Sequence, residues 1–366
     1  MNEHELAILR QFCLDAEPAS CTPYGCGHIN RTYLVATAGG RCYILQKINH
    51  HTFRDVAGLM ENIELVTEHL RRKSPDPRSV LTLIRTKDGK SYLEADDGYW
   101  RVFRFVEDSI CLQQPESDAD FYESAVGFGT FQQLLSDFPA EKLHETIPNF
   151  HNTPDRYRAF HETLTRDPMH RAAQVQPEIE FALARQAEMA ALQNALDAGE
   201  LPLRVTHNDT KLNNVLFDAK TRKALCIIDL DTVMPGSALY DYGDSIRFGA
   251  ATAAEDEREL DKMEMSLERF RVFTRGYVRA CPGLTQKELE LLPLGAKVMT
   301  MECGVRFLTD HIDGDNYFSI HREGQNLDRA HTQFKLVADM ERKWDKMKEI
   351  VNEEVQNAKE NGSCCI

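Results

Sequence analysis

Short apolar stretches separated by turns dominate the first hundred residues of the chain. Residues 30–48 contain two arms rich in β-branched and aromatic side chains around an Ala-Gly-Gly turn, which predicts a β-hairpin. Residues 80–86 and 99–106 predict two further strands. Residues 55–73 instead repeat apolar side chains at helical spacing and end in Arg-Arg-Lys, which predicts a helix. After a short helix within residues 1–20, we therefore expect a mainly antiparallel sheet with one helix.

Helical spacing takes over after Glu107. Helices are expected at residues 120–136, 154–170, 177–198 and 331–360. Two short apolar stretches, VLFD and ALCIIDLDTV, interrupt them and predict a pair of short strands. The chain is too long for one ordinary hydrophobic core. The pattern thus predicts an α+β chain of two lobes with a cleft between them: a small, antiparallel, β-rich lobe over residues 1–107 and a larger, mainly α-helical lobe over residues 108–366.

Composition and charge narrow the function further. Of the 366 residues, 42% are hydrophobic and 28% charged, which is normal for a globular protein, and the formal net charge is −15. A strongly acidic chain is a poor binder of nucleic acid or anionic membranes, so we expect neither partner. The ten cysteines are scattered without zinc-site spacing, and no apolar run reaches 18 residues. With no signal peptide at the start, we expect a reducing cytoplasm.

One polar segment, THNDTKLNNVLFD at residues 206–218, stands immediately before a predicted strand. Burying so many polar side chains is costly, so the segment is either a solvated turn or a site that holds charge. The predicted hairpin that follows brings Asn214 and Asp229 together at its open end. An amide oxygen and a carboxylate near phosphate oxygens make a typical Mg²⁺ site. Asp209 is then placed to accept the proton of an attacking hydroxyl, and Lys211 to neutralise charge on a transferring phosphoryl group.

The spacing of this segment is specific. The pattern H-x-D-x-K-x-x-N, followed by a downstream aspartate, resembles the catalytic loop of the protein-kinase-like superfamily. Here it runs from His207 to Asn214 and continues to Asp229. The alternative is a polar turn whose Asn and Asp side chains cap strands and helices. That alternative explains the complete set of residues less well.

The first lobe contains the residues that we expect to hold a nucleotide. The glycine turn before the hairpin contributes Gly25, Gly27 and Asn30. Its backbone N–H groups would face phosphate oxygens. Lys47, at the end of the second arm, would reach the α- and β-phosphates. Its ionic partner is expected to be a glutamate of the 55–73 helix: Glu61 and Glu64 are both candidates, and Glu61 lies closer to the apolar face. A glycine turn or a strand-end lysine alone is usually only a solvated feature.

Three blocks of sequence resemble a particular branch of this superfamily, the aminoglycoside phosphotransferases and choline kinases, and within it the bacterial N-acetylhexosamine 1-kinases. The blocks are HNDTKLNNVLFD, residues 228–250 (IDLDTVMPGSALYDYGDSIRFGA) and residues 304–318 (GVRFLTDHIDGDNYF). The resemblance spans nearly the whole chain and departs from protein kinases in the glycine loop, in the I-D-L-D metal motif and in the lack of an A-P-E segment. It implies a protein-kinase-like fold and an enzyme that uses ATP and Mg²⁺ to phosphorylate the anomeric hydroxyl of N-acetylglucosamine or N-acetylgalactosamine.

The resemblance also implies roles for individual residues. Asp209 becomes the catalytic base and a ligand of the sugar hydroxyl, and sugar contacts come from the second and third blocks. A neutral sugar needs hydrogen-bond donors, carboxylates and a stacking ring. The residues that supply this set are Asp244, Arg247, Phe248, Arg306 and Tyr317, with His28 of the glycine loop as a further contact. Each has a plainer alternative: Asp244 with Arg247, and Arg306 with Asp310, are spaced as helix ion pairs. Phe248 fits a core position, Tyr317 a half-buried surface and His28 an exposed loop.

Two rival functions remain open at this point. The first is another small-molecule kinase of the same branch that acts on an aminoglycoside or choline, which the acidic balance favours weakly and Arg247 and Arg306 oppose. The second is a catalytically inactive kinase-like module that binds a nucleotide or a partner, which the complete set of catalytic residues opposes. The expected partners are ATP and a small sugar. The oligomeric state is left open, with a monomer favoured.

Overall fold

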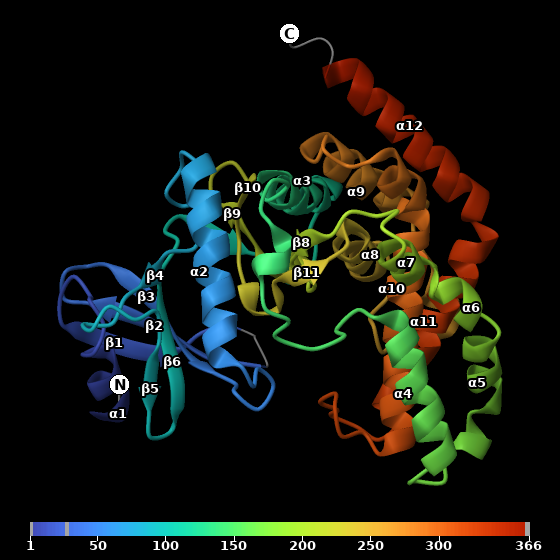
Figure 1. Ribbon diagram of the computed structural model, residues 1–366, viewed down its shortest axis with the longest axis horizontal. Helices are drawn as coiled ribbons and strands as arrows, with labels where there is room; N and C mark the ends of the chain where they lie inside the picture. The colour runs from blue at the N-terminus through green and yellow to red at the C-terminus, as the bar shows by residue number, and fades with distance from the viewer. Residues whose placement is uncertain (1–2, 26–28, 363–366) are drawn as a thin grey trace.

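The computed structural model describes residues 3–25 and 29–362, and its two lobes lie side by side in Figure 1. The elements of the first lobe are α1 (Glu3–Leu9), β1 (Pro18–Pro23), β2 (Arg31–Thr37), β3 (Cys42–Ile48), α2 (Val56–Lys73), β4 (Leu83–Ile84), β5 (Leu93–Ala95) and β6 (Gly98–Arg104). The strands form one sheet in the order β1-β2-β3-β6-β4, with β5 paired to β6. All of its pairs are antiparallel.

The two faces of this sheet carry different hydrophobic clusters, because side chains alternate along each strand. Tyr43 and Leu45 of β3 pack in one cluster with Leu9 of α1. Ile48 of β3 and Phe103 of β6 belong to a second cluster that includes the buried face of α2. The same alternation decides which polar residues of β3 and β6 face α2.

The second lobe is mainly helical. Its helices are α3 (Asp118–Leu134), α4 (Thr153–Arg166), α5 (Gln176–Leu183), α6 (Gln186–Met189), α7 (Ala191–Asp197), α8 (Ala238–Gly249), α9 (Leu267–Ala280), α10 (Gln286–Asp313), α11 (Gln325–Arg342) and α12 (Trp344–Gly362). Its strands are β7 (Ser109–Cys111), β8 (Arg204–Thr206), β9 (Val215–Asp218), β10 (Ala224–Ile227) and β11 (Met234–Gly236). Short 3₁₀ turns occur at η1 (Ala140–Lys142), η2 (Ala172–Gln174), η3 (Leu212–Asn214), η4 (Leu230–Thr232) and η5 (Leu260–Lys262).

The strands of the second lobe form two small sheets next to the first lobe. One sheet has the order β10-β9-β7, and the other pairs β8 with β11. Both are antiparallel, and Thr206 pairs with Met234. These short strands deliver the polar segments of the second lobe to the region between the lobes.

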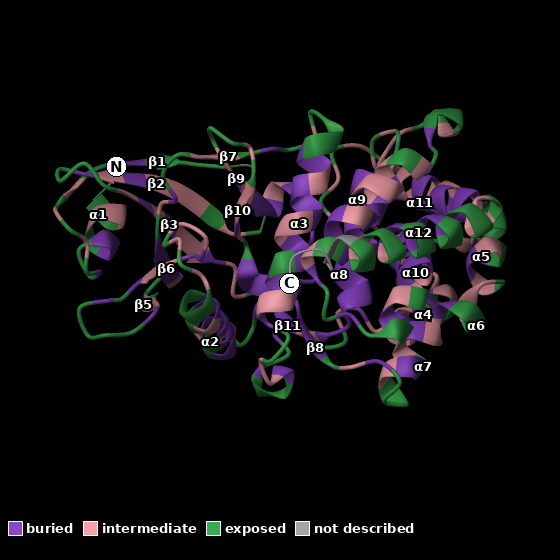
Figure 2. Cartoon of the chain, turned by 90° about the horizontal axis from the view of Figure 1, so that it is seen from above, coloured by how far each residue is buried: buried purple, intermediate pink, exposed green. Residues whose placement is uncertain are grey.

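Helix α8 lies at the centre of the second lobe, and buried residues run through this region in Figure 2. It packs closely on α10, while α3 packs on α9. Gly243 of α8 marks the tightest approach. A Cβ on it would collide with the carbonyl oxygen of Gly295 in α10 and would lie 2.6 Å from Met299 Cγ. The position of α8 is therefore fixed by backbone contact rather than by adjustable side chains.

Helix α2 ties the first lobe to the second. Asn62 on α2 is fully buried, and its amide nitrogen donates to the carbonyl oxygens of His144, at 2.8 Å, and Val233, at 3.0 Å. Its amide oxygen accepts a bond from His144 N at 2.8 Å. One polar side chain thus satisfies three backbone groups of the second lobe and sets how α2 sits against it.

The two-lobed α+β architecture predicted from the sequence is confirmed, with the hairpin β2–β3 and helix α2 close to the expected positions. Two expected helices are wrong in extent. Residues 177–198 form three short helices rather than one, and Arg185, between the first two, binds Glu341 of α11 at 2.8 and 2.9 Å. The expected helix at 331–360 is divided at Lys343, whose ammonium donates to Met265 O at 2.9 Å. Contacts across the fold override a continuous helical pattern in both places.

The boundary between the lobes at residues 107 and 108 stays a prediction. Strand β6 ends at Arg104, and β7 begins at Ser109 and pairs with β9 of the second lobe. Within residues 3–25 and 29–362, none of the helices combines the length and hydropathy needed to cross a membrane.

Replacement of Gly243 by alanine tests the close contact of α8 with α10. An alanine inside a helix is normally more stable than a glycine by about 1 kcal/mol. Here we expect the opposite sign, a loss of roughly 1–3 kcal/mol, because the added methyl group collides with the backbone of α10. Urea unfolding measures the difference, and a Gly243→Ala variant as stable as the wild type would contradict the packing described.

Candidate active site

The polar segment at residues 206–218 begins at the end of β8, forms the loop at residues 207–214 and continues through β9. Its start is held by the pairing of β8 with β11, and its end enters the β9–β10 hairpin. Ile228 N donates to Asn214 O at 2.9 Å and extends the pairing beyond the last residues of the two strands. Asn214 and Asp229 therefore meet at the open end of this hairpin, as the sequence predicted.

The buried carboxylate of Asp241 in α8 binds the backbone of this loop. Asp241 accepts hydrogen bonds from His207 N at 2.9 Å and from Asn208 N at 2.8 Å. Gln132 of α3 donates to the same carboxylate at 3.2 Å. Burial raises the pKa of Asp241, and these donors act in the opposite direction. Asn208 has a φ of 65°, a left-handed conformation that costs a residue with a side chain about 1 kcal/mol or more, so the loop depends on Asp241.

Asp209 presents its carboxylate to the space between the lobes. Lys211 Nζ lies 2.9 Å from Asp209 Oδ1. Asn214 Nδ2 donates to Asp209 Oδ2 at 3.1 Å and to its carbonyl oxygen at 2.8 Å. The Asp209 side chain keeps 28% of its surface exposed, so a hydroxyl group can reach it. The charge of Asp209 raises the pKa of Lys211, which keeps this ammonium positive at neutral pH.

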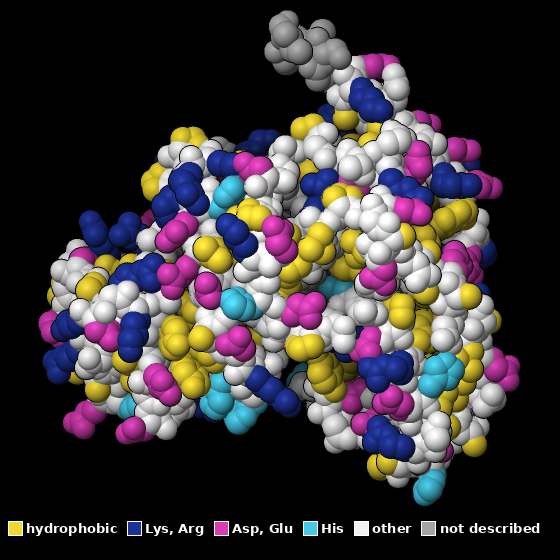
Figure 3. All heavy atoms as spheres, in the orientation of Figure 1, with side chains coloured by type: hydrophobic (Ala, Val, Ile, Leu, Met, Phe, Trp, Pro, Cys, Tyr) yellow, Lys and Arg dark blue, Asp and Glu magenta, His cyan; other side chains and the backbone are white. Residues whose placement is uncertain are grey.

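Asp229 stands on the opposite side of the hairpin end with a φ of 59° and reaches solvent. The protein around it removes part of its hydration, and the charges of Asp231 and Asp209 add to that effect, so its pKa is raised to about 7. His207 and Arg101 oppose the shift. Negative charge is thus concentrated here beyond what the nearby cations balance. Figure 3 shows a notch between the two lobes on one face of the molecule.

The donor set at this point fits a hard divalent cation. Because the amide nitrogen of Asn214 is directed to Asp209, its oxygen is the atom left for a metal. Asp229 adds a carboxylate whose negative charge the surrounding protein disfavours until a cation arrives. Mg²⁺ is commonly held by one or two such oxygens together with phosphate oxygens and water. Asn214 and Asp229 are therefore suited to a magnesium ion shared with a nucleotide.

Part of the predicted glycine turn lies outside the described residues, namely Gly27 and His28. Gly25 is described and has a φ of +80°, a conformation that glycine adopts without strain. Asn30 accepts a bond from Asn49 N at 3.0 Å and donates to Asp231 Oδ2 at 2.6 Å. The structure therefore links this turn directly to the I-D-L-D segment of the second lobe. Asp231 is thus a contact between the two lobes.

The predicted ion pair between Lys47 and a glutamate of α2 does not form. Lys47 Nζ instead lies 2.6 Å from Asp97 Oδ2. Glu61 binds His144 at 2.8 Å, and Glu64 binds Arg85 at 2.7 Å. The reason is alternation along β3, because Lys47 follows Tyr43 and Leu45 onto the face of the sheet that α1 covers, away from α2.

On the face of the sheet that α2 covers, β6 places a buried cation, Arg101, which the sequence interpretation missed. Its side chain is 1% exposed. Its Nε donates to Gln46 Oε1 at 3.0 Å, and its NH1 lies 2.6 Å from Asp231 Oδ1. Gln46 precedes Lys47 on β3 and points to the opposite face. The alternation of Tyr-Ile-Leu-Gln-Lys is the signal that would have found this arrangement.

The predicted sugar contacts in α8 are occupied by other partners. Asp244 Oδ2 accepts a bond from Thr210 N at 3.2 Å, and its Oδ1 accepts one from Arg247 at 2.9 Å. Arg247 also binds Glu255 at 2.7 Å. Burial favours protonated Asp244, but the charges of Arg247 and Lys211 outweigh it and lower its pKa. The pair of Asp244 and Arg247 is the helix ion pair that the sequence offered as the alternative to sugar binding. Through Thr210 N, Asp244 also supports the loop that carries Asp209. Phe248 is half-buried.

The predicted contacts in the third block lie together at the end of α10. Arg306 donates to Tyr317 Oη at 3.3 Å, and its guanidinium lies 5.3 Å from the ring of Phe150. Tyr317 is 65% exposed. Arg306 does not pair with Asp310, because Asp310 accepts the backbone N–H groups of residues 316–318, each at 2.9 Å. The block therefore presents one cation and one open aromatic ring.

A second buried network, which the sequence interpretation also missed, connects this block to the loop between β8 and β9. His151 follows Phe150, and one of its ring nitrogens lies 3.1 Å from Asn208 O. The other lies 2.8 Å from Glu302 Oε1 of α10. The charge of His151 and its hydrogen bond lower the pKa of Glu302 despite burial. Both partners of the imidazole are acceptors, so the ring acts as a double donor that joins α10 to the loop.

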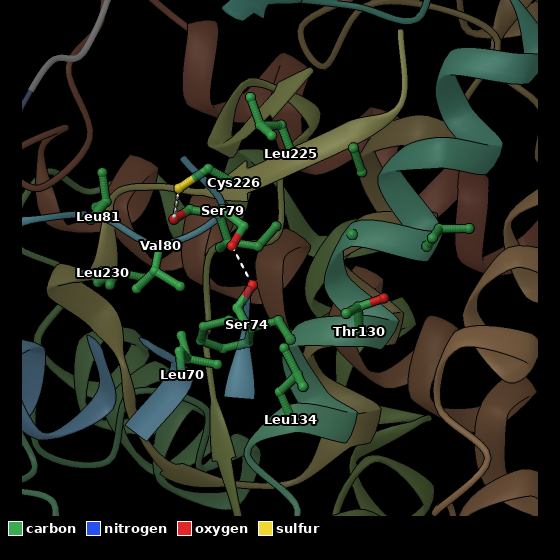
Figure 4. Close-up of a pocket in the computed structure, with 15 residues that line it drawn as sticks. Leu70, Ser74, Ser79, Val80, Leu81, Thr130, Leu134, Leu225, Cys226 and Leu230 are labelled. Atoms are coloured by element: carbon green, nitrogen blue, oxygen red, sulfur yellow. Dashed lines mark hydrogen bonds between the residues drawn. The ribbon is translucent and has the colours of Figure 1, made fainter. Parts of the chain in front are cut away.

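A separate cavity of about 190 Å³ lies between the end of α2, α3 and β10 (Figure 4). Apolar side chains, among them Cys226, form most of its wall, and burial raises the pKa of the Cys226 thiol to about 12. Ser74 and Ser79 hydrogen-bond to each other at its edge. None of the predicted site residues lines this cavity. It is a gap in the packing between the lobes and does not take part in the site.

Comparison with known proteins places the chain in a family. Residues 20–272, well over half of the 366 residues, match the phosphotransferase enzyme family, APH. The chain belongs to this family, and it is therefore a phosphotransferase. The residues described above, from Asp209 to Asp229, lie within the matched range.

Solved structures share the fold at low sequence identity. A microcompartment-associated aminopropanol kinase has a TM-score of 0.58 at 17% identity, over 94% of this chain and 98% of its own. A spectinomycin phosphotransferase in complex with ADP and spectinomycin has a TM-score of 0.58 at 11% identity, over 93% and 98%. A choline kinase from Cryptosporidium parvum Iowa II has a TM-score of 0.58 at 12% identity, over 96% and 98%. The fold is thus the protein-kinase-like one expected from the sequence.

Replacement of Asp241 by asparagine tests the support of the loop. An amide has one acceptor oxygen, so it cannot accept bonds from His207 N and Asn208 N on separate carboxylate oxygens as Asp241 does. We expect the free energy of unfolding to fall by about 1–3 kcal/mol and kcat to fall with it. Urea unfolding and an ADP-release assay measure the two effects.

The matched control is Asp345→Asn, at an exposed position on α12. This change should alter stability by no more than about 0.5 kcal/mol. Equal behaviour of the two variants would show that the loop does not depend on Asp241.

Proposed function

We propose that the chain transfers the γ-phosphoryl group of ATP, with Mg²⁺, to the anomeric C1 hydroxyl of N-acetylhexosamines. The acceptors are N-acetylglucosamine and N-acetylgalactosamine, and the product is the sugar 1-phosphate. The observation that carries the phosphoryl transfer is the grouping of Asp209, Lys211 and Asn214 within hydrogen-bond distance, beside Asp229. The three sequence blocks that resemble N-acetylhexosamine 1-kinases support the acceptor.

The residues of the loop have separate roles in the proposed reaction. Asp209 orients the acceptor hydroxyl and takes its proton as the oxygen attacks the γ-phosphorus in line. Lys211 lies on the same carboxylate and offers its ammonium to the charge that spreads over the equatorial oxygens. Asn214 and Asp229 would hold Mg²⁺, which when bound neutralises charge on the phosphates. Asp244 accepts a hydrogen bond from Thr210 N and so helps to fix the position of the loop that carries Asp209.

The charges around the loop favour a neutral acceptor. An acceptor with amino groups needs free carboxylates to receive it, as in a site for aminoglycosides or choline. Here Asp244 is paired with Arg247, and Glu302 faces His151. Arg306 adds a further positive charge next to the exposed ring of Tyr317. A hydroxyl-rich sugar with an acetamido group can use a cation as donor and an aromatic ring as a stacking surface.

The rival functions rest on specific observations as well. The solved structures with this fold include an aminopropanol kinase and a choline kinase, so an amino alcohol is the second candidate acceptor. An inactive module that binds only a nucleotide or a partner would not need Asp209, whose carboxylate contacts Lys211 and Asn214 and is still partly exposed. Turnover decides between these functions directly.

An ADP-release assay with Mg-ATP and a panel of acceptors separates the candidates. The panel contains N-acetylglucosamine, N-acetylgalactosamine, glucose, galactose, choline and kanamycin. Turnover on the two N-acetyl sugars is the expected result. Turnover on choline or kanamycin alone would keep the phosphotransferase and replace the acceptor. Binding of ATP without turnover on any of the six would favour the inactive module.

The Asp209→Asn variant tests the proposed base. The amide keeps the size of the side chain but cannot accept the proton, so kcat should fall at least about 100-fold. Binding of ADP, followed by calorimetry, should stay within about twofold of the wild type, since Asp209 contacts the acceptor rather than the nucleotide. Wild-type turnover in this variant would remove Asp209 from the role of base, and Asp345→Asn again serves as the control.

A further inference from the structure

The first lobe contains two cations that can be compared directly as ligands of a nucleotide. In protein kinases a lysine on the third strand binds the phosphates and pairs with a glutamate of the following helix. Lys47 occupies the third strand here, but its ammonium is 2.6 Å from Asp97 and 5.5 Å from the ring centre of Trp100. Burial favours neutral Asp97, yet hydrogen bonds from Lys47, Trp100 and His4 lower its pKa to about 2. Lys47 therefore lies on the face of the sheet that α1 covers and already has an ionic partner there.

Arg101 occupies the other face of the same sheet. It pairs across strands with Gln46, and its guanidinium lies 5.1 Å from the ring of Phe103, two residues along β6. Its NH1 also lies 3.9 Å from Met60 Sδ of α2. These contacts fix the guanidinium between the sheet, α2 and the I-D-L-D segment. Arg101 thus stands on the side of the sheet where Asp229 is, and its charge acts on Asp229.

Asp231, the present partner of Arg101, keeps another hydrogen-bond donor when Arg101 moves away. Asp231 accepts a bond from Asn30 at 2.6 Å in addition to its ion pair with Arg101, also at 2.6 Å. When Arg101 leaves, Asp231 keeps a hydrogen-bond donor from the first lobe. Arg101 in turn keeps Gln46, and a guanidinium has five N–H donors arranged for two-point binding of phosphate oxygens. Gln46 and the sulfur of Met60 accept two of those donors, and the contact with Asp231 is an ion pair.

We propose that Arg101 is the phosphate-binding cation of the first lobe, which exchanges Asp231 for the α- and β-phosphates of the nucleotide. The proposal rests on the proposed function, since it assumes that ATP is the donor. Because Arg101 is only 1% exposed, a phosphate reaches it when the first lobe and the Asp231 segment move apart. The ion pair is then a latch that holds the lobes together without nucleotide and opens when nucleotide binds.

Calorimetric titrations with ADP and with adenosine, in EDTA, test this assignment. Arg101→Met should weaken ADP binding about tenfold or more, because a charged hydrogen bond to phosphate is lost. Adenosine binding should stay within about twofold, since adenosine has no phosphate. Asp231→Asn should bind ADP as tightly as the wild type or more tightly, because the latch is weaker. Arg104→Met, an exposed position on the same strand, should match the wild type for both ligands.

The double variant Arg101→Met/Asp231→Asn separates phosphate binding from a purely structural ion pair. It leaves no unpaired buried charge, so it removes the folding penalty that a single change at Arg101 brings. We expect its ADP affinity to stay about tenfold weak while adenosine binding is kept. Recovery of wild-type ADP affinity would overturn the proposal, because Arg101 would then serve only Asp231.

Two further results would also overturn it. A loss of adenosine binding in the double variant would show that Arg101 supports the lobe rather than the phosphates. A large loss of ADP affinity in Lys47→Met, with Arg101→Met unchanged, would return the role to Lys47. Failure of the wild type to bind ADP when Mg²⁺ is present would instead contradict the proposed function itself, so the two failures are distinguishable.

Discussion

The carboxylate of Asp241 determines the geometry of the candidate site. It accepts two consecutive backbone N–H groups of the loop and a side-chain amide of α3. Its burial is costly for a charged group, and these three donors offset the cost only while the loop keeps its left-handed turn at Asn208. Because α8 is fixed against α10 by the contact at Gly243, the carboxylate has a fixed position. The placement of Asp209 follows from that chain of contacts.

A second constraint governs how the lobes meet. Asn62 satisfies three backbone groups of the second lobe, and Asp231 is held by Asn30 and Arg101 of the first. These polar contacts are specific in direction, so they help to define one arrangement of the lobes. Loss of hydration, together with the charges of Asp231 and Asp209, raises the pKa of Asp229 at this junction. A magnesium ion at Asn214 and Asp229, as proposed, would offset this negative charge.

The sequence predicted those parts of the fold that depend on local periodicity or on a closely spaced motif. The β2–β3 hairpin, α2 and the meeting of Asn214 with Asp229 follow from alternation, helical spacing and the next hairpin. The breaks in the two divided helices were not predicted, because Arg185 and Lys343 make contacts with segments far along the chain. Lys47 was assigned to the nucleotide from its place in the chain, whereas the alternation of β3 turns it away. Asp241 and His151 act through backbone groups of the loop, and no pattern in the sequence marks such partners.

The most direct test of the account is the position of the phosphate in the product. The chain is incubated with Mg-ATP and either N-acetylglucosamine or N-acetylgalactosamine, and the phosphorus NMR spectrum of the purified sugar phosphate is recorded with proton coupling. The account predicts one phosphomonoester signal coupled to the anomeric proton. A phosphate coupled instead to the C6 methylene protons, or no sugar phosphate at all with either N-acetyl sugar, would contradict it.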